Sequence, residues 1–168
     1  MKKALLAALL AIAALVALAC SGGEDENLTP PPQATPSEQL RLTVALEVQS
    51  SVGVGEAVPL TLRLRNEGES LASVYLGGNV PYDFVVSKPN GTEVWRWLAS
   101  QVILPLLELK TLDGGEELKF EGEWDQRNNE GRPVSPGAYL VRGVLKGETP
   151  EGQRLELKTE PRELVITP

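Results

Sequence analysis

Apolar and polar side chains alternate in short runs over residues 41–168. In residues 42–48 and 58–64, leucine or valine occupies every second position, and the positions between them are mostly polar. A period of two is typical of a β-strand with one buried face. Similar alternation, or a short apolar run between turn residues, predicts further strands at 71–76, 106–112, 118–124, 139–145, 155–157 and 164–166.

The clearest pattern is a hairpin at residues 81–97. Its first strand alternates large apolar residues with other side chains, and Pro-Asn-Gly at 89–91 supplies the turn. Its second strand carries Trp95 and Trp97. Because residues two apart in a strand share a face, we expect both rings on one side of the sheet, and the fold to be organised around this hairpin.

The sequence predicts an all-β fold. No segment after residue 40 keeps a helical period, and the one helix-like candidate, residues 99–107, is interrupted by Pro105. Many short strands with Gly- and Pro-rich turns predict an immunoglobulin-like antiparallel β-sandwich of about eight or nine strands over 41–168. Tyr139 follows a Pro-Gly turn, as the corner tyrosine of such sandwiches does.

Residues 1–19 have the layout of a secretory signal peptide. Two lysines precede an apolar run over residues 4–18, which is short for a transmembrane helix. The following Ala17-Leu18-Ala19-Cys20 resembles the lipobox of bacterial lipoproteins. That resemblance implies that Cys20, the one cysteine of the chain, is lipidated and becomes the mature N-terminus.

Residues 20–40 are polar, acidic and proline-rich, and such a segment cannot bury enough surface to offset the entropy of ordering. We expect a disordered tether that reaches at most about 60 Å at about 3.1 Å per residue. The protein is therefore expected to be exported to the cell envelope and anchored to a membrane by its lipid, with the domain at 41–168 held near the surface.

Composition excludes several kinds of chemistry. The chain has 16 basic and 23 acidic residues, a net charge of −7, so nucleic acid is not an expected partner. There is no histidine, which excludes Ser-His-Asp and Cys-His catalysis. The segment from Asp125 to Gly131 lacks the acidic third position and the distal glutamate of a calcium loop. We expect no enzymatic activity, no metal and no cofactor.

Two motifs in the hairpin are distinctive: Tyr82-Asp83-Phe84 and Val94-Trp95-Arg96-Trp97. With Phe120, Trp124 and the Pro-Gly-Ala-Tyr at 136–139, they resemble the intracellular proteinase inhibitor (BsuPI) family over residues 55–147. The resemblance implies an immunoglobulin-like fold and inhibition of a serine protease by protein–protein binding. It implies no reactive site, and we interpret its signature residues as structural: Tyr82, Asp83, Phe84, Trp95, Arg96, Trp97, Trp124 and Tyr139.

Two loops are candidates for contact with a protease. Residues 125–136 carry Arg127 and Arg132, which would suit a trypsin-like enzyme, whereas residues 98–107 would suit a subtilisin-like one. The candidate residues in the second loop are Leu98, Ile103 and Leu104. We expect the apolar run at 102–107 to fill the sandwich, the alternative being an exposed interaction patch.

Two further hypotheses for the function of the domain remain open. The domain could be a non-inhibitory surface binding module or a structural spacer, and its oligomeric state is undetermined by the sequence. Asp83 and Arg96 lie on facing strands of the hairpin, where they are expected to form a structural ion pair rather than an acid–base pair.

Overall fold

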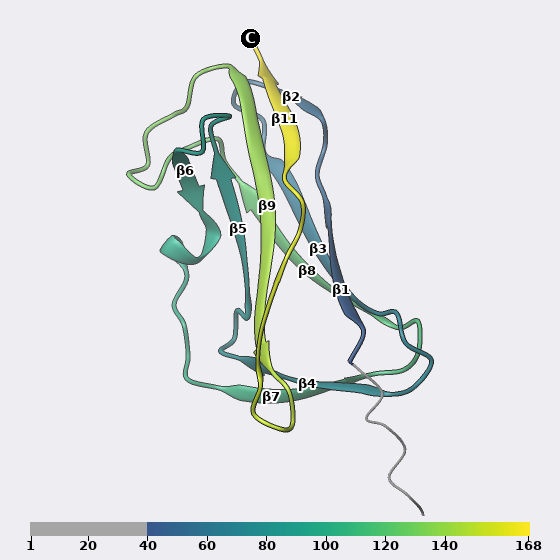
Figure 1. Cartoon of the computed structure of the whole chain (residues 1–168). Helices are drawn as coiled ribbons and strands as arrows, with labels where there is room; N and C mark the ends of the chain where they lie inside the picture. Colours follow the sequence, from purple (N-terminus) through teal and green to yellow (C-terminus); the bar gives the residue numbers. More distant parts are fainter. Residues whose placement is uncertain (1–39) are drawn as a thin grey trace, which may run out of the picture. The chain divides into compact units, whose positions relative to one another are not determined.

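The computed structural model describes residues 40–168 (Figure 1). This part of the chain contains eleven strands and one short 3₁₀ helix, η1, at Trp97–Ser100. The strands are β1 Leu42–Glu47, β2 Ser51–Gly53, β3 Val58–Asn66, β4 Ala72–Gly77, β5 Tyr82–Ser87, β6 Glu93–Arg96, β7 Leu107–Leu112, β8 Glu117–Trp124, β9 Gly137–Glu148, β10 Arg154–Lys158 and β11 Arg162–Thr167.

These strands form two packed sheets, which confirms the all-β sandwich. The smaller sheet has the order β1-β3-β8, and the larger runs β2-β11-β9-β4-β7, with β10 and β5 also paired to β9 and β6 paired to β5. Strand pairs are antiparallel except that of β2 with β11, which is parallel. The count exceeds the expected eight or nine, partly because three-residue β2 has no alternation that could reveal it.

The twelve-residue strand β9 is the centre of the larger sheet. Along one edge it pairs first with β11 and then with β10, and along the other with β5 and then β4. At Gly143 an added Cβ would lie 2.5 Å from Leu62 Cδ1, so glycine is what lets β9 approach the smaller sheet. The hairpin at 81–97 is thus attached to β9, which replaces it as the organising element.

The hairpin itself is present as strands β5 and β6. Gly91 donates its N–H to Lys88 O, and its φ of +87° explains glycine at this turn position. The second strand ends at Arg96, one residue earlier than expected, because Trp97 begins η1. The rings of Trp95 and Trp97 nevertheless meet edge to face, with centroids 6.2 Å apart.

The core lies between the two sheets. Leu60, Leu62 and Leu64 of β3 are fully buried, as the alternation predicts, and they face large side chains of the other strands. An aromatic cluster continues this core, with successive rings in contact: Tyr82 with Trp97, Trp97 with Trp95, Trp95 with Trp124, and Trp124 with Tyr139. The signature aromatics are therefore packing residues, and burial of their rings is a main source of stability.

Candidate functional site

The segment between η1 and β7 exposes several large apolar side chains to solvent. We call residues 101–106 the apolar loop. Exposed fractions range from 48% for Leu104 to 78% for Val102, and the exposed apolar series continues into β7 at Leu107 and Leu109. Contiguous apolar surface of this kind is typical of an interaction site.

The expectation that 102–107 fills the sandwich is therefore wrong. The space between the sheets is already occupied by the leucines of β3 and the aromatic cluster. The apolar loop instead descends outside the core, from η1 to β7 (Figure 1). The helix-like candidate at 99–107 is also absent, since only η1 is helical and the chain is extended at Gln101.

A side-chain amide from another part of the chain fixes the middle of this loop. Asn79 Nδ2 donates to Val102 O at 3.1 Å, and Leu104 N–H donates to Asn79 Oδ1 at 2.8 Å. The sequence does not single out Asn79. It follows Gly77, the last residue of β4, and Gly78, and Gly-Gly-Asn in a sequence signals only a turn.

The end of the loop is tied to the sheet by backbone bonds. Gly78 N–H donates to Leu106 O at 2.7 Å, and Leu106 N–H donates to Leu104 O at 2.8 Å. Gly78 has a φ of +75°, and an added Cβ would lie 3.1 Å from Ile103 Cγ2. A glycine is thus required where the loop packs against the end of β4.

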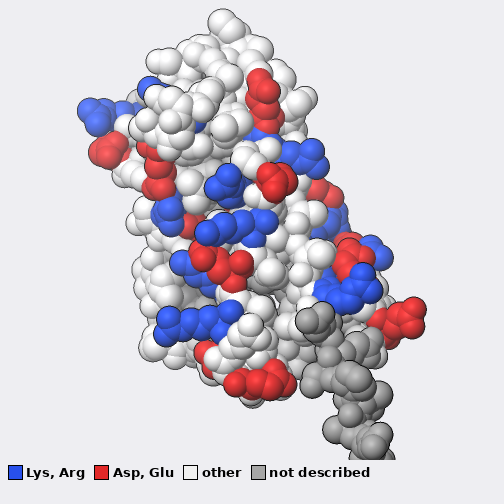
Figure 2. Space-filling model, in the orientation of Figure 1, with Lys and Arg blue, Asp and Glu red and all other residues white. Residues whose placement is uncertain are grey.

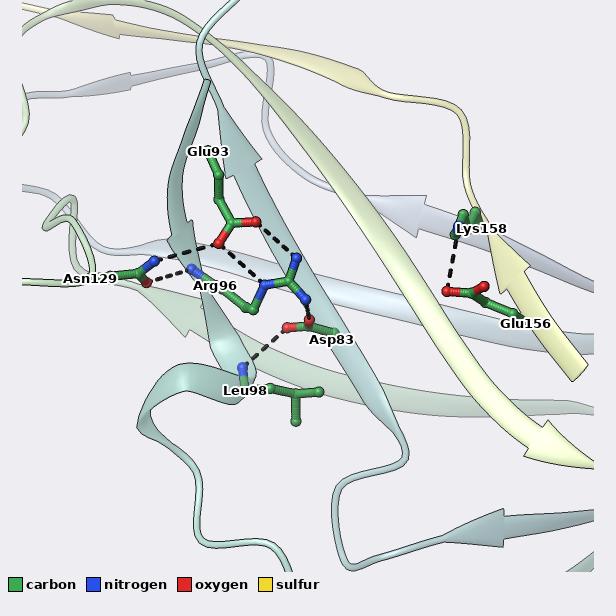
Figure 3. Close-up of polar contacts among 7 residues, drawn as sticks. All are labelled: Asp83, Glu93, Arg96, Leu98, Asn129, Glu156 and Lys158. Carbon is green, nitrogen blue, oxygen red and sulfur yellow. Dashed lines mark hydrogen bonds and ion pairs between the residues drawn. The ribbon is translucent and has the colours of Figure 1, made fainter. Parts of the chain in front are cut away.

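The short helix η1, which directly precedes the apolar loop, is held by the buried carboxylate of Asp83 (Figure 3). Its Oδ1 accepts the N–H of Leu98 at 3.1 Å, and its Oδ2 accepts Arg96 Nη1 at 3.0 Å. The guanidinium also donates to Glu93, with Arg96 Nη2 2.8 Å from Glu93 Oε2. The expected pair of Asp83 and Arg96 thus has a further function, which is to position η1.

Electrostatics in this cluster follow from burial and hydrogen bonding. Burial raises the pKa of the Asp83 carboxyl, against the opposing influence of the Leu98 N–H and the Arg96 guanidinium. The hydrogen bond from Arg96 lowers the pKa of Glu93. Because both oxygens of Asp83 already accept hydrogen bonds, the geometry supports positioning rather than proton transfer to a substrate.

The other candidate loop, residues 125–136, is held mainly by its own hydrogen bonds. We call it the arginine loop. Arg127 Nη1 donates to Gly131 O at 2.7 Å, and its backbone carbonyl accepts Trp124 Nε1, also at 2.7 Å. Arg132 is the more exposed of its arginines and lies 3.5 Å from Glu130. Both arginines thus have acidic or carbonyl partners within the loop.

The arginine loop also covers the outer edge of β6. Asn129 N–H donates to Val94 O at 3.1 Å, and Asn129 Oδ1 accepts the N–H of Arg96 at 2.9 Å. At its base, the amide of buried Gln126 donates to Gly53 O and Glu56 O. These contacts satisfy backbone groups that an edge strand would otherwise expose.

Three signature residues have structural contacts, of which the sequence suggests only that of Tyr139. The Tyr139 hydroxyl donates to Ser135 O at 2.7 Å, four residues upstream, as a corner tyrosine does. The Tyr82 hydroxyl donates to Glu121 O on the opposite sheet, also at 2.7 Å. Phe84 is fully buried beside Gly122, where an added Cβ would lie 2.9 Å from its ring.

A charged groove of about 400 Å³ lies on the outer face of the larger sheet. Figure 2 shows lysine and arginine side chains interspersed with acidic ones on the face that includes β9. Lys158 pairs with Glu156 at 3.4 Å, as Figure 3 also shows. The groove has mixed charge and is open along the sheet, so its shape defines no particular ligand.

No metal-binding group of three or more acidic, cysteine or histidine residues occurs in the described chain. No helix within residues 40–168 is long and apolar enough to span a membrane. Cys20, the predicted leader and the predicted tether up to residue 39 lie outside the described residues.

The protein is thus an immunoglobulin-like β-sandwich, and its apolar loop is both exposed and held in place by hydrogen bonds. The family model of the intracellular proteinase inhibitor, BsuPI, matches residues 42–150, and the chain belongs to this family. The match extends the resemblance seen in the sequence at both ends, and it includes the apolar loop.

Solved structures resemble this chain in fold alone. A CARDB domain from Pyrococcus furiosus is 18% identical, with a TM-score of 0.40 and coverage of 77% of this chain and 86% of that one. The ApaA protein of Bordetella pertussis is 16% identical, with a TM-score of 0.47 and coverage of 78% and 98%.

The alkylpurine DNA glycosylase AlkC of Pseudomonas fluorescens is 16% identical, with a TM-score of 0.42, and the match covers 77% of this chain. This chain spans only 31% of the length of the glycosylase chain. No curated protein matches the sequence.

Proposed function

We propose that this protein is a membrane-tethered lipoprotein of the cell envelope that inhibits a serine protease by presenting the apolar loop. Membership in the proteinase inhibitor family supports a protease as the partner. The observation that carries the proposal is the combination of exposure and order in the loop. Its apolar side chains face solvent, while Asn79 and Gly78 hold its backbone from outside.

Preorganisation is the physical reason that this combination matters. A protein segment that binds an active site loses affinity when it must be ordered on binding, at about 0.5–1.5 kcal/mol for each immobilised side chain. Many small inhibitors avoid that loss with disulfides, which a chain with one cysteine cannot form internally. Here Asn79 and Gly78 restrain the loop at its middle and end, and Asp83 holds η1 directly before it.

The test is an inhibition panel. Purified chain from residue 40 onward is assayed against a subtilisin-like, a chymotrypsin-like and a trypsin-like serine protease. We expect inhibition of an enzyme with an apolar specificity pocket, and none of the trypsin-like enzyme. Absence of inhibition throughout the panel at micromolar concentration would overturn the proposal.

The anchor is supported by the apolar leader and by the placement of the only cysteine directly after it. A lipid on Cys20 followed by the polar segment to residue 40 would keep the domain close to the membrane. The substitution Cys20→Ala is expected to shift the protein from the membrane fraction to the soluble fraction. Retention of the variant in the membrane fraction would contradict lipid anchoring at this residue.

One observation favours a second function, a non-inhibitory binding module. Strand β7 is the end strand of the larger sheet, so its outer edge is unpaired within the described residues, and Leu107 and Leu109 are exposed on it. An exposed edge can accept a strand from a partner. If the partner binds the edge of β7, Leu109→Lys should abolish partner capture. If the protease instead binds the apolar loop, the same substitution should leave protease inhibition unchanged.

A further inference from the structure

Asn79 holds the backbone on both sides of a single residue, Ile103. Its amide donates to the carbonyl of Val102, the residue before, and accepts the N–H of Leu104, the residue after. Two hydrogen bonds from one rigid amide plane fix the path of the chain across Ile103. The side chain of Ile103 itself remains half exposed, at 50%.

The peptide groups around Ile103 differ in whether they have hydrogen-bond partners within the protein. The carbonyls of Val102 and Leu104 both accept hydrogen bonds from the protein itself. The N–H and C=O of Ile103 have no partner within residues 40–168. A serine protease requires a free carbonyl at the residue before the bond it attacks, because that oxygen must accept hydrogen bonds in the oxyanion hole.

We infer that Ile103 is the residue that enters the primary specificity pocket of the target, with the Ile103–Leu104 peptide bond placed across the catalytic serine. This inference rests on the proposed function. It assigns the target a neutral, apolar pocket that accepts a β-branched aliphatic side chain. A trypsin-like pocket, which is built around a carboxylate to bind Lys or Arg, is excluded.

The amide of Asn79 also explains how such a loop can resist cleavage. When the serine oxygen attacks the Ile103 carbonyl carbon, an ester forms, the C–N bond breaks, and the nitrogen of Leu104 leaves with a proton from the protease histidine. Asn79 still holds Val102 on one side of the break and Leu104 on the other. The new amine therefore stays beside the ester, attacks it, and restores the peptide bond, with the proton and the serine returned.

Pro105 supports the same arrangement. It fixes φ next to the departing residue, and the carbonyl of Leu104 accepts the N–H of Leu106 across it. The leaving side is thereby restrained both before and after Leu104. Asn79 is thus a positioning residue, since it acts through the backbone and not on the protease.

The experiment uses the full chain and three single substitutions to lysine, assayed for inhibition of elastase, subtilisin and trypsin. Ile103→Lys is expected to weaken inhibition of the apolar-pocket enzyme by at least about a hundredfold, because a lysine charge would be desolvated there, and to create inhibition of trypsin. Val102→Lys, at the neighbouring exposed position, should create none. Val54→Lys, an exposed valine before β3, is the charge-matched control and should change neither.

Two outcomes separate the inference from the proposed function. If the unchanged protein inhibits none of the three enzymes, the proposed function fails. If it inhibits, but Val102→Lys rather than Ile103→Lys creates trypsin inhibition, the function stands and the assignment of Ile103 is overturned. Inhibition that no lysine substitution alters would equally overturn it.

Asn79→Ala gives an independent readout. Loss of the amide is expected to raise the rate of cleavage between Ile103 and Leu104 by about tenfold or more, as detected by mass spectrometry of the fragments, with the melting temperature little changed. Asn79→Asp keeps the acceptor for Leu104 but loses the donor to Val102, so cleavage should be intermediate. Equal resistance in all three proteins, or cleavage at a different bond, would contradict the role of the amide.

Discussion

The apolar loop and the arginine loop differ in what their polar backbone groups do. In the arginine loop they are used within the loop or to cover the edge of β6. In the apolar loop, Asn79 and Gly78 hold selected groups from outside, and the N–H and C=O of Ile103 are among the groups that have no partner within residues 40–168. An exposed loop is available to a partner when its restraints come from the scaffold and its own groups remain free.

The largest expected effect is on the arginine loop through Trp124. This ring is fully buried, and its Nε1 donates to Arg127 O. Trp124→Ala should lower the free energy of unfolding by about 3–5 kcal/mol, measured by urea denaturation. At temperatures where the variant stays folded, inhibition should be unchanged, and a parallel loss of inhibition would break the distinction between the two loops.

The second effect concerns the start of the apolar loop. Asp83→Ala leaves the N–H of Leu98 without its acceptor and removes one partner of Arg96. We expect a loss of about 1–3 kcal/mol in stability, together with weaker inhibition. Glu93→Ala is the matched control, because it removes the exposed partner of the same guanidinium, together with a long contact to Asn129, and leaves the Asp83–Leu98 hydrogen bond in place. If both variants lose inhibition equally, Asp83 does not position the loop.

The contribution of the buried Asp83 carboxyl to stability should depend on pH. Because the pKa of Asp83 is raised on folding, the folded state binds more protons than the unfolded state between the two pKa values. This contribution to stability is fully present below the ordinary aspartate pKa and is lost as pH rises through the folded pKa. The stability advantage of the wild type over Asp83→Asn should therefore be larger at about pH 4 than at about pH 7.

The titration of Glu93 runs in the opposite direction, since its pKa is lowered on folding. Glu93 is present in both proteins, so its contribution largely cancels in the comparison. Denaturation curves at the two pH values provide the measurement. An advantage that shrinks on acidification would mean that Arg96, and not burial, dominates at Asp83.

The smallest expected effect is at Arg132. Its side chain is exposed, and its contact with Glu130 is a surface pair of the kind that contributes little. Arg132→Ala should change stability by less than about 0.5 kcal/mol and leave inhibition as it was. A clear loss of inhibition would assign a partner contact to the arginine loop.

The fold class was predictable because apolar and polar residues that alternate with a period of two indicate a half-buried strand directly. The leucines at 60, 62 and 64 are all fully buried, as that pattern requires. Strand β2 and the end of β6 were not predictable, since neither is marked by a change in the pattern of apolar and polar residues. The parallel pairing of β2 with β11 joins segments too far apart in sequence for any local pattern to show.

For the candidate site, the sequence indicates candidate residues but not their geometry. Leu98, Ile103 and Leu104 were singled out by their apolar character, yet the same character predicted burial at 102–107. Hydrophobicity does not tell which of several apolar segments will occupy a core of limited volume. The contact of Asn79 with the apolar loop depends on how β4 and β7 pair, and a turn signal carries no information about it.

The central claim is that the apolar loop, and not the arginine loop, contacts the protease. Its most direct test introduces one glutamate into each loop and measures inhibition of a protease that the unchanged protein inhibits. Leu104→Glu places a carboxylate in the apolar loop, and Arg132→Glu does so in the arginine loop. We predict that the first raises the inhibition constant by about a hundredfold or more and that the second leaves it within about threefold. An unchanged constant for Leu104→Glu with a large increase for Arg132→Glu would contradict the account.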